Sequence, residues 1–287
     1  MAKRSFSPLR YPGGKNKLCD SVVQILDENN IDNMVTYIEP YAGGASVALH
    51  LLISGRVRRI IINDIDKSIY AFWFSVLNYT DELCNLINDT EITMEQWRNA
   101  KQVLSNMEDY DILEIGFSTL FLNRTNRSGI LKGGVIGGKN QAGSYKLDCR
   151  FNKEDLISKI KLISKYKKKI RLYNMDTIDF IKNVVVKSRT KNFIFFDPPY
   201  YKKGQSLYIN YYNHQDHLNL SKKISSLRRH NWIVTYDYTQ EIDDMYNGYK
   251  KIVYDLQYTA QKKYKGKEII IFSKQLIVPE DFLLSYI

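Results

Sequence analysis

Short apolar runs recur along the chain, separated by stretches long enough for a helix. Seven of these runs have the composition of buried strands: Thr36–Ile38, Arg59–Asn63, Ile170–Asn174, Phe193–Phe196, Trp232–Tyr236, Lys251–Leu256 and Glu268–Phe272. Strands that alternate with helices predict an α/β fold with a parallel sheet and right-handed crossovers. The last two runs leave no room for a crossover helix, so they predict a hairpin and one antiparallel strand.

This alternation is interrupted between residues 71 and 164. Helix-like patterns occupy Phe72–Leu77, Met94–Met107 and Ile112–Leu122, and a polar stretch with six glycines follows at Ser128–Ser144. So many glycines argue against a packed helix and favour a hairpin or a mobile loop. We therefore predict a mainly helical inserted domain with a hairpin, residues 71–164. The remaining domain is formed by residues 1–70 and 165–287.

The chain is basic. Its 287 residues include 42 Lys and Arg against 31 Asp and Glu, and the net charge of +11 favours a polyanionic partner without establishing one. Between Lys146 and Leu172 ten basic residues outnumber three acids. Apolar positions in the same stretch, from Leu156 to Ile163, predict a helix with one packed face and one basic face.

The sequence gives little support for a metal site, a disulfide framework or a membrane-spanning helix. Cys19, Cys84 and Cys149 are odd in number and widely spaced, which indicates neither a disulfide framework nor a zinc site. His214 and His217 have HxxH spacing but no third ligand nearby, so helix capping or a phosphate contact is favoured over a metal. No apolar run approaches the ~20 residues of a membrane helix, and the N-terminus lacks an apolar leader. We expect a cytoplasmic protein with reduced thiols.

The most informative stretch is Asp197-Pro198-Pro199-Tyr200, directly after the apolar run Phe193–Phe196. Proline cannot continue a sheet ladder, so the strand ends there. The motif then lies at the carboxyl edge of the sheet, where α/β folds bind ligands. A carboxylate and a free proline carbonyl accept both hydrogens of an exocyclic amine, and a tyrosine stacks on a flat base. The alternative is an ordinary turn after a core strand.

Two other strand ends carry groups suited to a nucleoside. The first run leads into Glu39-Pro40-Tyr41-Ala42-Gly43-Gly44, where the glycines allow close approach of a ligand, although the spacing is not GxGxxG. Asp64 ends the second run and is well placed for ribose hydroxyls, whereas Asp66 is better placed to cap the next helix.

A glycine turn near the N-terminus, Tyr11-Pro12-Gly13-Gly14-Lys15, lacks both the P-loop spacing and a preceding strand. We expect Lys15 and the backbone amides of this turn to hold a carboxylate.

In their order along the chain, these motifs resemble those of the Dam-like DNA adenine N6-methyltransferases, the alpha group of the D12 class. The similar segments are Tyr11–Lys15 (motif X), Glu39–Gly44 (motif I), Asn63–Asp66 (motif II), Asn174–Asp176 (motif III), Asp197–Tyr200 (motif IV) and Val234–Asp237 (a late motif). Asn123-Arg124 and the glycine-rich segment are similar to the family's DNA-contacting region. The resemblance covers nearly the whole chain.

The resemblance implies a Rossmann-like seven-stranded methyltransferase sheet and transfer of a methyl group from S-adenosyl-L-methionine to adenine N6 in double-stranded DNA, after base flipping. The implied catalytic residues are Asp197, Pro198, Pro199 and Tyr200. The implied cofactor-binding residues are Tyr11, Gly14, Lys15, Glu39, Pro40, Tyr41, Ala42, Gly43, Gly44, Asp64 and Asp176, with Asp179 as an alternative to Asp176. The implied DNA-binding residues are Asn123, Arg124, Arg127, Lys132, Lys139, Asn140, Gln141 and Lys146.

The implied setting is a bacterial or phage-encoded enzyme, a monomer or weak dimer, with or without a cognate restriction enzyme that acts separately. The segment after Asn123 differs from the Asn-Arg-x-Gly-Phe-Asn-Gly form of the GATC enzymes, which leaves the target sequence open. Tyr41 and Ala45 are milder departures, from Phe and from a third Gly.

Three rival functions remain. Enzymes that methylate cytosine N4 more often carry Ser where Asp197 stands, and RNA adenine enzymes seldom carry so long an insertion. A catalytically silent DNA-binding regulator is disfavoured because Glu39, Asp64, Asp197 and Tyr200 are intact.

Overall fold

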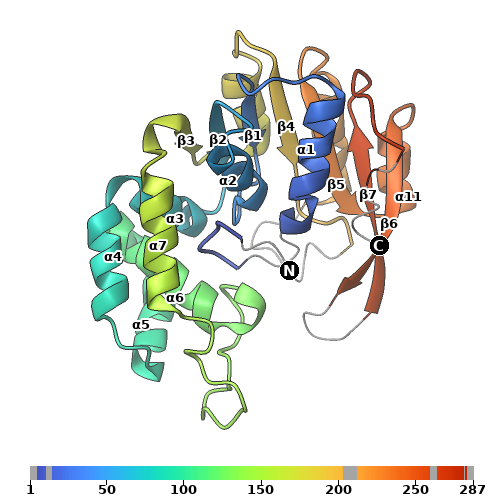
Figure 1. Ribbon diagram of the computed structural model, residues 1–287. Helices are drawn as coiled ribbons and strands as arrows, with labels where there is room; N and C mark the ends of the chain where they lie inside the picture. The colour runs from blue at the N-terminus through green and yellow to red at the C-terminus, as the bar shows by residue number, and fades with distance from the viewer. Residues whose placement is uncertain (1–4, 11–14, 203–211, 259–263, 281, 283–287) are drawn as a thin grey trace.

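The computed structural model describes residues 5–10, 15–202, 212–258, 264–280 and 282. In this part of the chain seven strands form one sheet, in the order β3-β2-β1-β4-β5-β7-β6 (Figure 1). The strands are β1 (Thr36–Glu39), β2 (Arg59–Asn63), β3 (Ile170–Tyr173), β4 (Asn192–Phe196), β5 (Asn231–Asp237), β6 (Lys250–Tyr258) and β7 (Tyr264–Phe272). β1 to β5 are parallel, and β7 is antiparallel to β5 and β6. The predicted α/β fold with an antiparallel terminal strand is confirmed.

Helices cover both faces of this sheet. They are α1 (Cys19–Glu28) and α2 (Ser46–Ile53) on the face toward the viewer in Figure 1, and α8 (Thr177–Phe180), α10 (His214–Ser225) and α11 (Gln240–Met245) on the other. Successive side chains of a strand point to opposite faces of the sheet and pack against different helices. Phe193 packs with the α1–α2 core, whereas Ile194 packs with the α10 core. Burial on both faces explains why the central strands read as continuous apolar runs.

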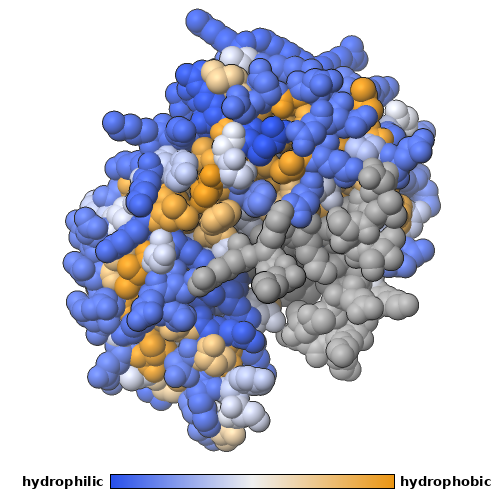
Figure 2. Space-filling model, viewed as in Figure 1, coloured by the Kyte–Doolittle hydropathy of each residue, from blue (hydrophilic) through white to orange (hydrophobic). Residues whose placement is uncertain are grey.

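Five helices lie between β2 and β3 in the chain. They are α3 (Lys67–Asn78), α4 (Thr80–Asp89), α5 (Met94–Ser105), α6 (Ile112–Thr125) and α7 (Lys153–Ser164). The boundary predicted after residue 70 falls inside α3. Gly116 lets α6 approach α3, since a Cβ there would lie 2.5 Å from Ser75 Oγ. The apolar side chains of these helices continue the α1–α2 core. On the outer surface seen in Figure 2, hydrophilic side chains predominate over these helices and the sheet, with smaller hydrophobic patches between them.

The glycine-rich segment after α6 is a compact loop. The expected hairpin takes the form of one antiparallel bridge between Asn126 and Val135, and the short 3₁₀ turn Arg127–Gly129 lies within the loop that this bridge closes. Positive φ angles at Gly137 (84°) and Gly138 (78°) explain the glycines at the tight bends that follow.

The β6–β7 hairpin is longer than the apolar pattern predicts. β5 pairs with β7 only as far as Asp237↔Glu268, while β6 and β7 continue to pair up to Tyr258↔Tyr264. None of the helices in the described residues is long and apolar enough to cross a bilayer.

Candidate active site

Carboxylates gather at one edge of the sheet. Each of the five parallel strands ends in an acidic residue or is followed by one; in spatial order along the edge these are Asp176, Asp64, Glu39, Asp197 and Asp237. Because the carboxyl ends of parallel strands meet at the same edge, the fold brings together acids from positions 39 to 237. Such an edge suits a ligand that carries positive charge or several hydrogen-bond donors.

The turn after β1 is held from both sides. Glu39 Oε1 accepts hydrogen bonds from Ala48 N (2.9 Å) and Tyr37 Oη (3.1 Å), and burial raises the pKa of Glu39 to about 8. Gly43 and Ala45 adopt positive φ angles of 44° and 47°. This left-handed backbone turns the chain sharply into α2, and it explains why a glycine stands at position 43.

Neighbouring backbone groups of the same turn are tied to β2. Asn63 Nδ2 donates to the carbonyls of Pro40 and Met175 (both 3.0 Å), and Ala42 N donates to the Asn63 carbonyl (2.9 Å). The Tyr41 and Tyr212 hydroxyls are 3.1 Å apart. The bonds of Asn63 and Ala42 join the ends of β1, β2 and β3. Gly44 lies in the turn between β1 and α2.

Asp64 occupies the tip of β2. Its two carboxylate oxygens accept hydrogen bonds from Gly43 N (2.8 Å) and Asp66 N (3.0 Å). Burial raises the pKa of Asp64 to about 7, and the bond from Gly43 N opposes this shift. A carboxylate offers about four lone-pair sites, so acceptor capacity remains for two ligand hydroxyls. Asp66 caps α3, as predicted, through Ser68 N.

Asp176 follows β3 and caps the short helix α8, because its Oδ1 accepts from Ile178 N (2.8 Å) and Asp179 N (3.4 Å). The cofactor contact expected of Asp176 stays a prediction. Asp179, the alternative, is exposed.

The Asp-Pro-Pro-Tyr motif follows β4 and joins a buried polar network. Asp197 Oδ1 accepts from Thr235 Oγ1 (2.6 Å) and lies 3.2 Å from Lys15 Nζ. Burial raises the pKa of Asp197, and the Lys15 ammonium and the Thr235 bond oppose this shift. The side chain is still 24% exposed, so the carboxylate is both constrained and accessible.

Tyr200 is the more deeply buried end of the motif, with 3% of its surface exposed. Its hydroxyl accepts from Lys15 Nζ (2.9 Å) and donates to Glu268 Oε1, and the ammonium lies 5.1 Å from the centre of its ring. Stacking of a base on the ring face under Lys15 therefore requires that lysine to move.

The chain after the motif is fixed by Asp237, whose two oxygens accept from Tyr201 N (2.7 Å) and Lys202 N (3.0 Å). Thr235 and Asp237 thus both support the motif from the neighbouring strand β5. This gives a structural reason for the late Val234–Asp237 motif.

The structure adds a second set of contacts for Lys15. The Lys15 ammonium lies beside the carboxylates of Asp197 and Glu268, next to the catalytic motif, and its expected contact with the cofactor stays a prediction. Tyr11 and Gly14, assigned to the cofactor from the sequence, lie outside the described residues. Sequence reasoning missed Glu268, although a single acid that opens the apolar run Ile269–Phe272 was a usable signal.

Three of the residues expected to contact DNA form hydrogen bonds within the protein. Asn123 is 1% exposed, and its amide exchanges bonds with Arg10 N and O (2.7 Å each) and donates to Gly129 O. Arg124 donates to the Pro8 carbonyl, and burial lowers its pKa to about 10. Gln141 bonds to Ile136, Gly138 and Leu147 of its own loop.

We therefore withdraw Asn123 and Gln141 from the expected DNA-contacting set, because a direct contact would break the bonds that hold the loop. Five other members of the set are exposed to solvent: Arg127, Lys132, Lys139, Asn140 and Lys146.

The two histidines after the motif contact tyrosines. His214 Nδ1 is 2.8 Å from Tyr201 Oη, and His217 Nδ1 is 3.1 Å from Tyr236 Oη. Burial lowers the pKa of His217 to about 4, so it is neutral at pH 7. Within the described residues, no three His, Cys, Asp or Glu side chains are grouped to hold a metal ion.

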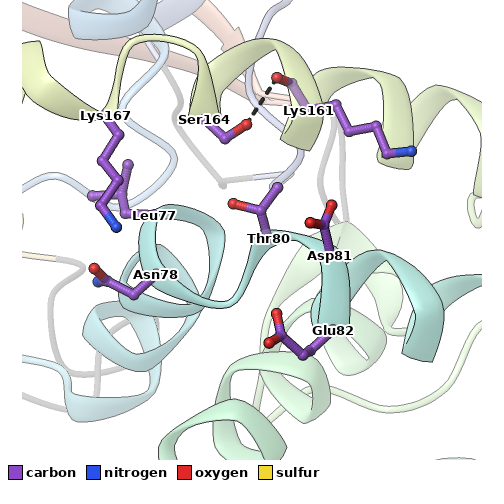
Figure 3. A pocket seen from close by; sticks show the side chains of 8 residues that line it. All are labelled: Leu77, Asn78, Thr80, Asp81, Glu82, Lys161, Ser164 and Lys167. Atoms are coloured by element: carbon purple, nitrogen blue, oxygen red, sulfur yellow. Dashed lines mark hydrogen bonds between the residues drawn. The ribbon is translucent and has the colours of Figure 1, made fainter.

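A separate depression of about 430 Å³ lies between α4 and α7 (Figure 3). Its lining mixes the acids Asp81 and Glu82 with Lys161 and Lys167, and it contains none of the strand-end residues. We therefore place the candidate active site at the carboxyl edge of the sheet and not in this depression.

Comparison with known proteins agrees with the motifs. A family model for D12 class N6 adenine-specific DNA methyltransferases matches residues 11–260. The Type II methyltransferase M.MjaIII of Methanocaldococcus jannaschii is 27% identical over 75% of this chain and 77% of its own length. The Type II methyltransferase M.CviBI of Paramecium bursaria Chlorella virus NC1A is 26% identical over 78% of this chain and 81% of its own.

Among solved structures, the rRNA methyltransferase aviRa from Streptomyces viridochromogenes is 11% identical, with a TM-score of 0.40, over 93% of this chain and 88% of its own. The family model spans the candidate site, the inserted helices and the catalytic motif together. This chain belongs to the D12 class N6 adenine-specific DNA methyltransferase family.

Proposed function

We propose that this protein is a site-specific adenine DNA-methyltransferase that flips its target base out of the duplex and methylates N6. The observation that carries this proposal is the position of Asp197. Its constrained, partly exposed carboxylate lies at the end of β4, beside the strand ends that carry Glu39 and Asp64. An adenine inside a duplex is out of reach of this edge, so base flipping is required, at a cost of a few kcal/mol.

The strand ends fit S-adenosylmethionine, the methyl donor of the family. Asp64 has acceptor capacity left for both ribose hydroxyls, and Ile65 beside it is 42% exposed and apolar, as an adenine ring requires. The turn at Gly43–Gly44 would hold the methionine part, and Asp176 the cofactor adenine. When bound, the donor supplies a methyl group activated by a sulfonium.

The protein's part in methyl transfer is to activate and align the adenine amine. The lone pair of this amine is delocalised into the ring, so it is a weak nucleophile. The Asp197 carboxylate and the Pro198 carbonyl would accept its two hydrogens and direct the lone pair toward the methyl group. Proline nitrogens at 198 and 199 carry no N–H that competes for these acceptors. Tyr200 would hold the base plane, and the rate gain comes mainly from alignment.

We propose that residues 71–164 form the DNA target-recognition domain. Arg127 and Asn140 are exposed and have the chemistry to read base edges, and Lys132, Lys139 and Lys146 suit phosphate contacts. The Type II methyltransferases among its relatives support site-specific methylation and a restriction enzyme that acts separately. We expect a monomer or weak dimer that works in the cytoplasm of a bacterium or a phage-infected cell.

Transfer of labelled methyl groups to unmethylated duplex DNA tests the proposal. Wild-type protein should label adenine N6 at a defined sequence, and Asp197→Ala should label none. Labelling of RNA, or of cytosine in DNA, would show that adenine in duplex DNA is not the substrate. DNA binding without any labelling would identify a catalytically silent regulator.

A further inference from the structure

Glu268 lies at the catalytic motif without belonging to any recognised motif. It is 1% exposed and occupies the last position at which β7 pairs with β5, opposite Asp237. Across the β6–β7 ladder it is opposite Tyr254. The residue therefore stands where the hairpin leaves the body of the sheet, at the same edge as Asp197.

The two oxygens of Glu268 have different partners. Oε1 accepts from the Tyr200 hydroxyl, and Oε2 accepts from the Tyr254 hydroxyl (2.6 Å) and lies 3.5 Å from Lys15 Nζ. Lys15 Nζ in turn lies 3.2 Å from Asp197 Oδ1 and donates to the Tyr200 hydroxyl. One ammonium is thus shared between two carboxylates, and the Tyr200 hydroxyl is bonded to that ammonium and to Glu268.

We infer that Glu268 is a positioning residue for methyl transfer, which holds Tyr200 and Lys15 so that Asp197 stays available to the target amine. This inference rests on the proposed function. Glu268 acts through these two side chains, since its own oxygens are occupied by Tyr200, Tyr254 and Lys15.

The physical reason is competition for Asp197. The adenine amine and the Lys15 ammonium are both N–H donors, and both are attracted to the carboxylate of Asp197. Charge attraction is strong at a buried site, so a Lys15 without Glu268 would pair with Asp197 alone. Glu268 shares the ammonium with Asp197, so that the charge of Lys15 is divided between two carboxylates, and it also fixes the Tyr200 hydroxyl, which sets the plane of the ring.

Two variants of the full chain test this role, with one control. Glu268→Gln keeps the shape but removes the charge, and Tyr254→Phe removes one hydrogen bond to Glu268 without touching Tyr200 or Lys15. The control, Asp243→Asn, removes the ion pair (2.9 Å) that joins Asp243 of α11 to Lys251 of β6, outside the site. For each protein we would measure the single-turnover rate of methyl transfer at saturating DNA and cofactor, the Kd for DNA, the Kd for cofactor, and the Tm.

We expect Glu268→Gln to slow methyl transfer at least tenfold and Tyr254→Phe severalfold, while the Kd for cofactor changes less than twofold. Asp243→Asn should transfer at the wild-type rate. An unchanged rate in Glu268→Gln overturns the inference. So does a loss explained by weaker cofactor binding, because a positioning residue lowers kcat and not affinity.

A double-mutant cycle with Tyr200→Phe shows whether the effect passes through the tyrosine hydroxyl. The combined loss should be smaller than the product of the two single losses. A combined loss equal to the product overturns the inference. If Glu268→Gln fails to fold, the cycle of Tyr254→Phe with Tyr200→Phe decides the question. Inactive wild-type protein would contradict the proposed function itself, whereas active wild-type and equally active Glu268→Gln would contradict only this inference.

Discussion

The buried carboxyl group of Asp64 should make cofactor affinity depend on pH near neutrality. Burial raises its pKa from 3.8 to about 7 in the protein without ligand. Ribose hydroxyls need a carboxylate that accepts two hydrogen bonds, and a protonated carboxyl has lost part of that capacity. Binding therefore selects the ionised form, and affinity is expected to fall as the pH drops through 7.

The magnitude follows from the ionised fraction. With a pKa of about 7, roughly nine-tenths of Asp64 is ionised at pH 8 and roughly one-tenth at pH 6. The Kd for S-adenosylmethionine should thus rise about tenfold between pH 8 and pH 6, which is about 1.4 kcal/mol.

The same raised pKa affects the free energy of unfolding in the opposite direction: a higher pH favours cofactor binding but lowers the stability of the free protein. Its contribution to the stability of the free protein is full below pH 3.8 and is lost as the pH rises through about 7.

Calorimetric titration of wild type, Asp64→Asn and Glu39→Gln at pH 6, 7 and 8 provides the assay. The amine of the ligand titrates equally in all three, so differences between proteins isolate the side chain. Asp64→Asn should bind about 1–3 kcal/mol more weakly at pH 8, because charge-assisted hydrogen bonds are lost, and should not share the tenfold change. Glu39 has a pKa of about 8 and also titrates in this range, but its Oε1 is engaged by Ala48 N and Tyr37 Oη. Glu39→Gln removes that titration and should keep the change that depends on Asp64. An Asp64→Asn protein with the wild-type pH dependence would refute the reasoning.

Four further outcomes are expected. Asp197→Ala should abolish methyl transfer and leave the calorimetric Kd for cofactor nearly unchanged; near-normal turnover would remove Asp197 from the reaction. Asn123→Ala should lower the free energy of unfolding by about 1–3 kcal/mol, since its buried amide bonds are lost, and an unchanged denaturation midpoint would contradict this. Replacing Ser128–Ser144 by a short linker should destroy site-specific methylation and spare cofactor binding; methylation of the same sites would locate recognition elsewhere. Lys139→Ala should weaken DNA binding across sequences and reduce the slope of log K against log salt by about one, measured by fluorescence anisotropy, and an equal slope would exclude a phosphate contact.

The sequence by itself determined the order of strands along the chain and the chemistry at their ends. Strands buried on both faces are continuous apolar runs, so β1 to β5 were readable within about one residue. Proline marked where β1 and β4 stopped, which located Glu39 and Asp197, and the end of the apolar run Arg59–Asn63 located Asp64. These signals are local, because they depend on the period and composition of a few adjacent residues.

Only the tertiary structure decided which distant side chains meet. Lys15 and Tyr200 are 185 positions apart, and their contact with Glu268 arises because β7 inserts beside β5 in the sheet. The Asn123 side chain has the hydrogen-bonding groups of a DNA-reading residue. Its amide oxygen instead accepts a hydrogen bond from the backbone N–H of Arg10, 113 positions away. The β6–β7 extension likewise follows from pairing between two strands and not from an apolar pattern. Hydrogen bonds and ion pairs of this kind depend on spatial position, and the local pattern of polar and apolar residues does not encode that position.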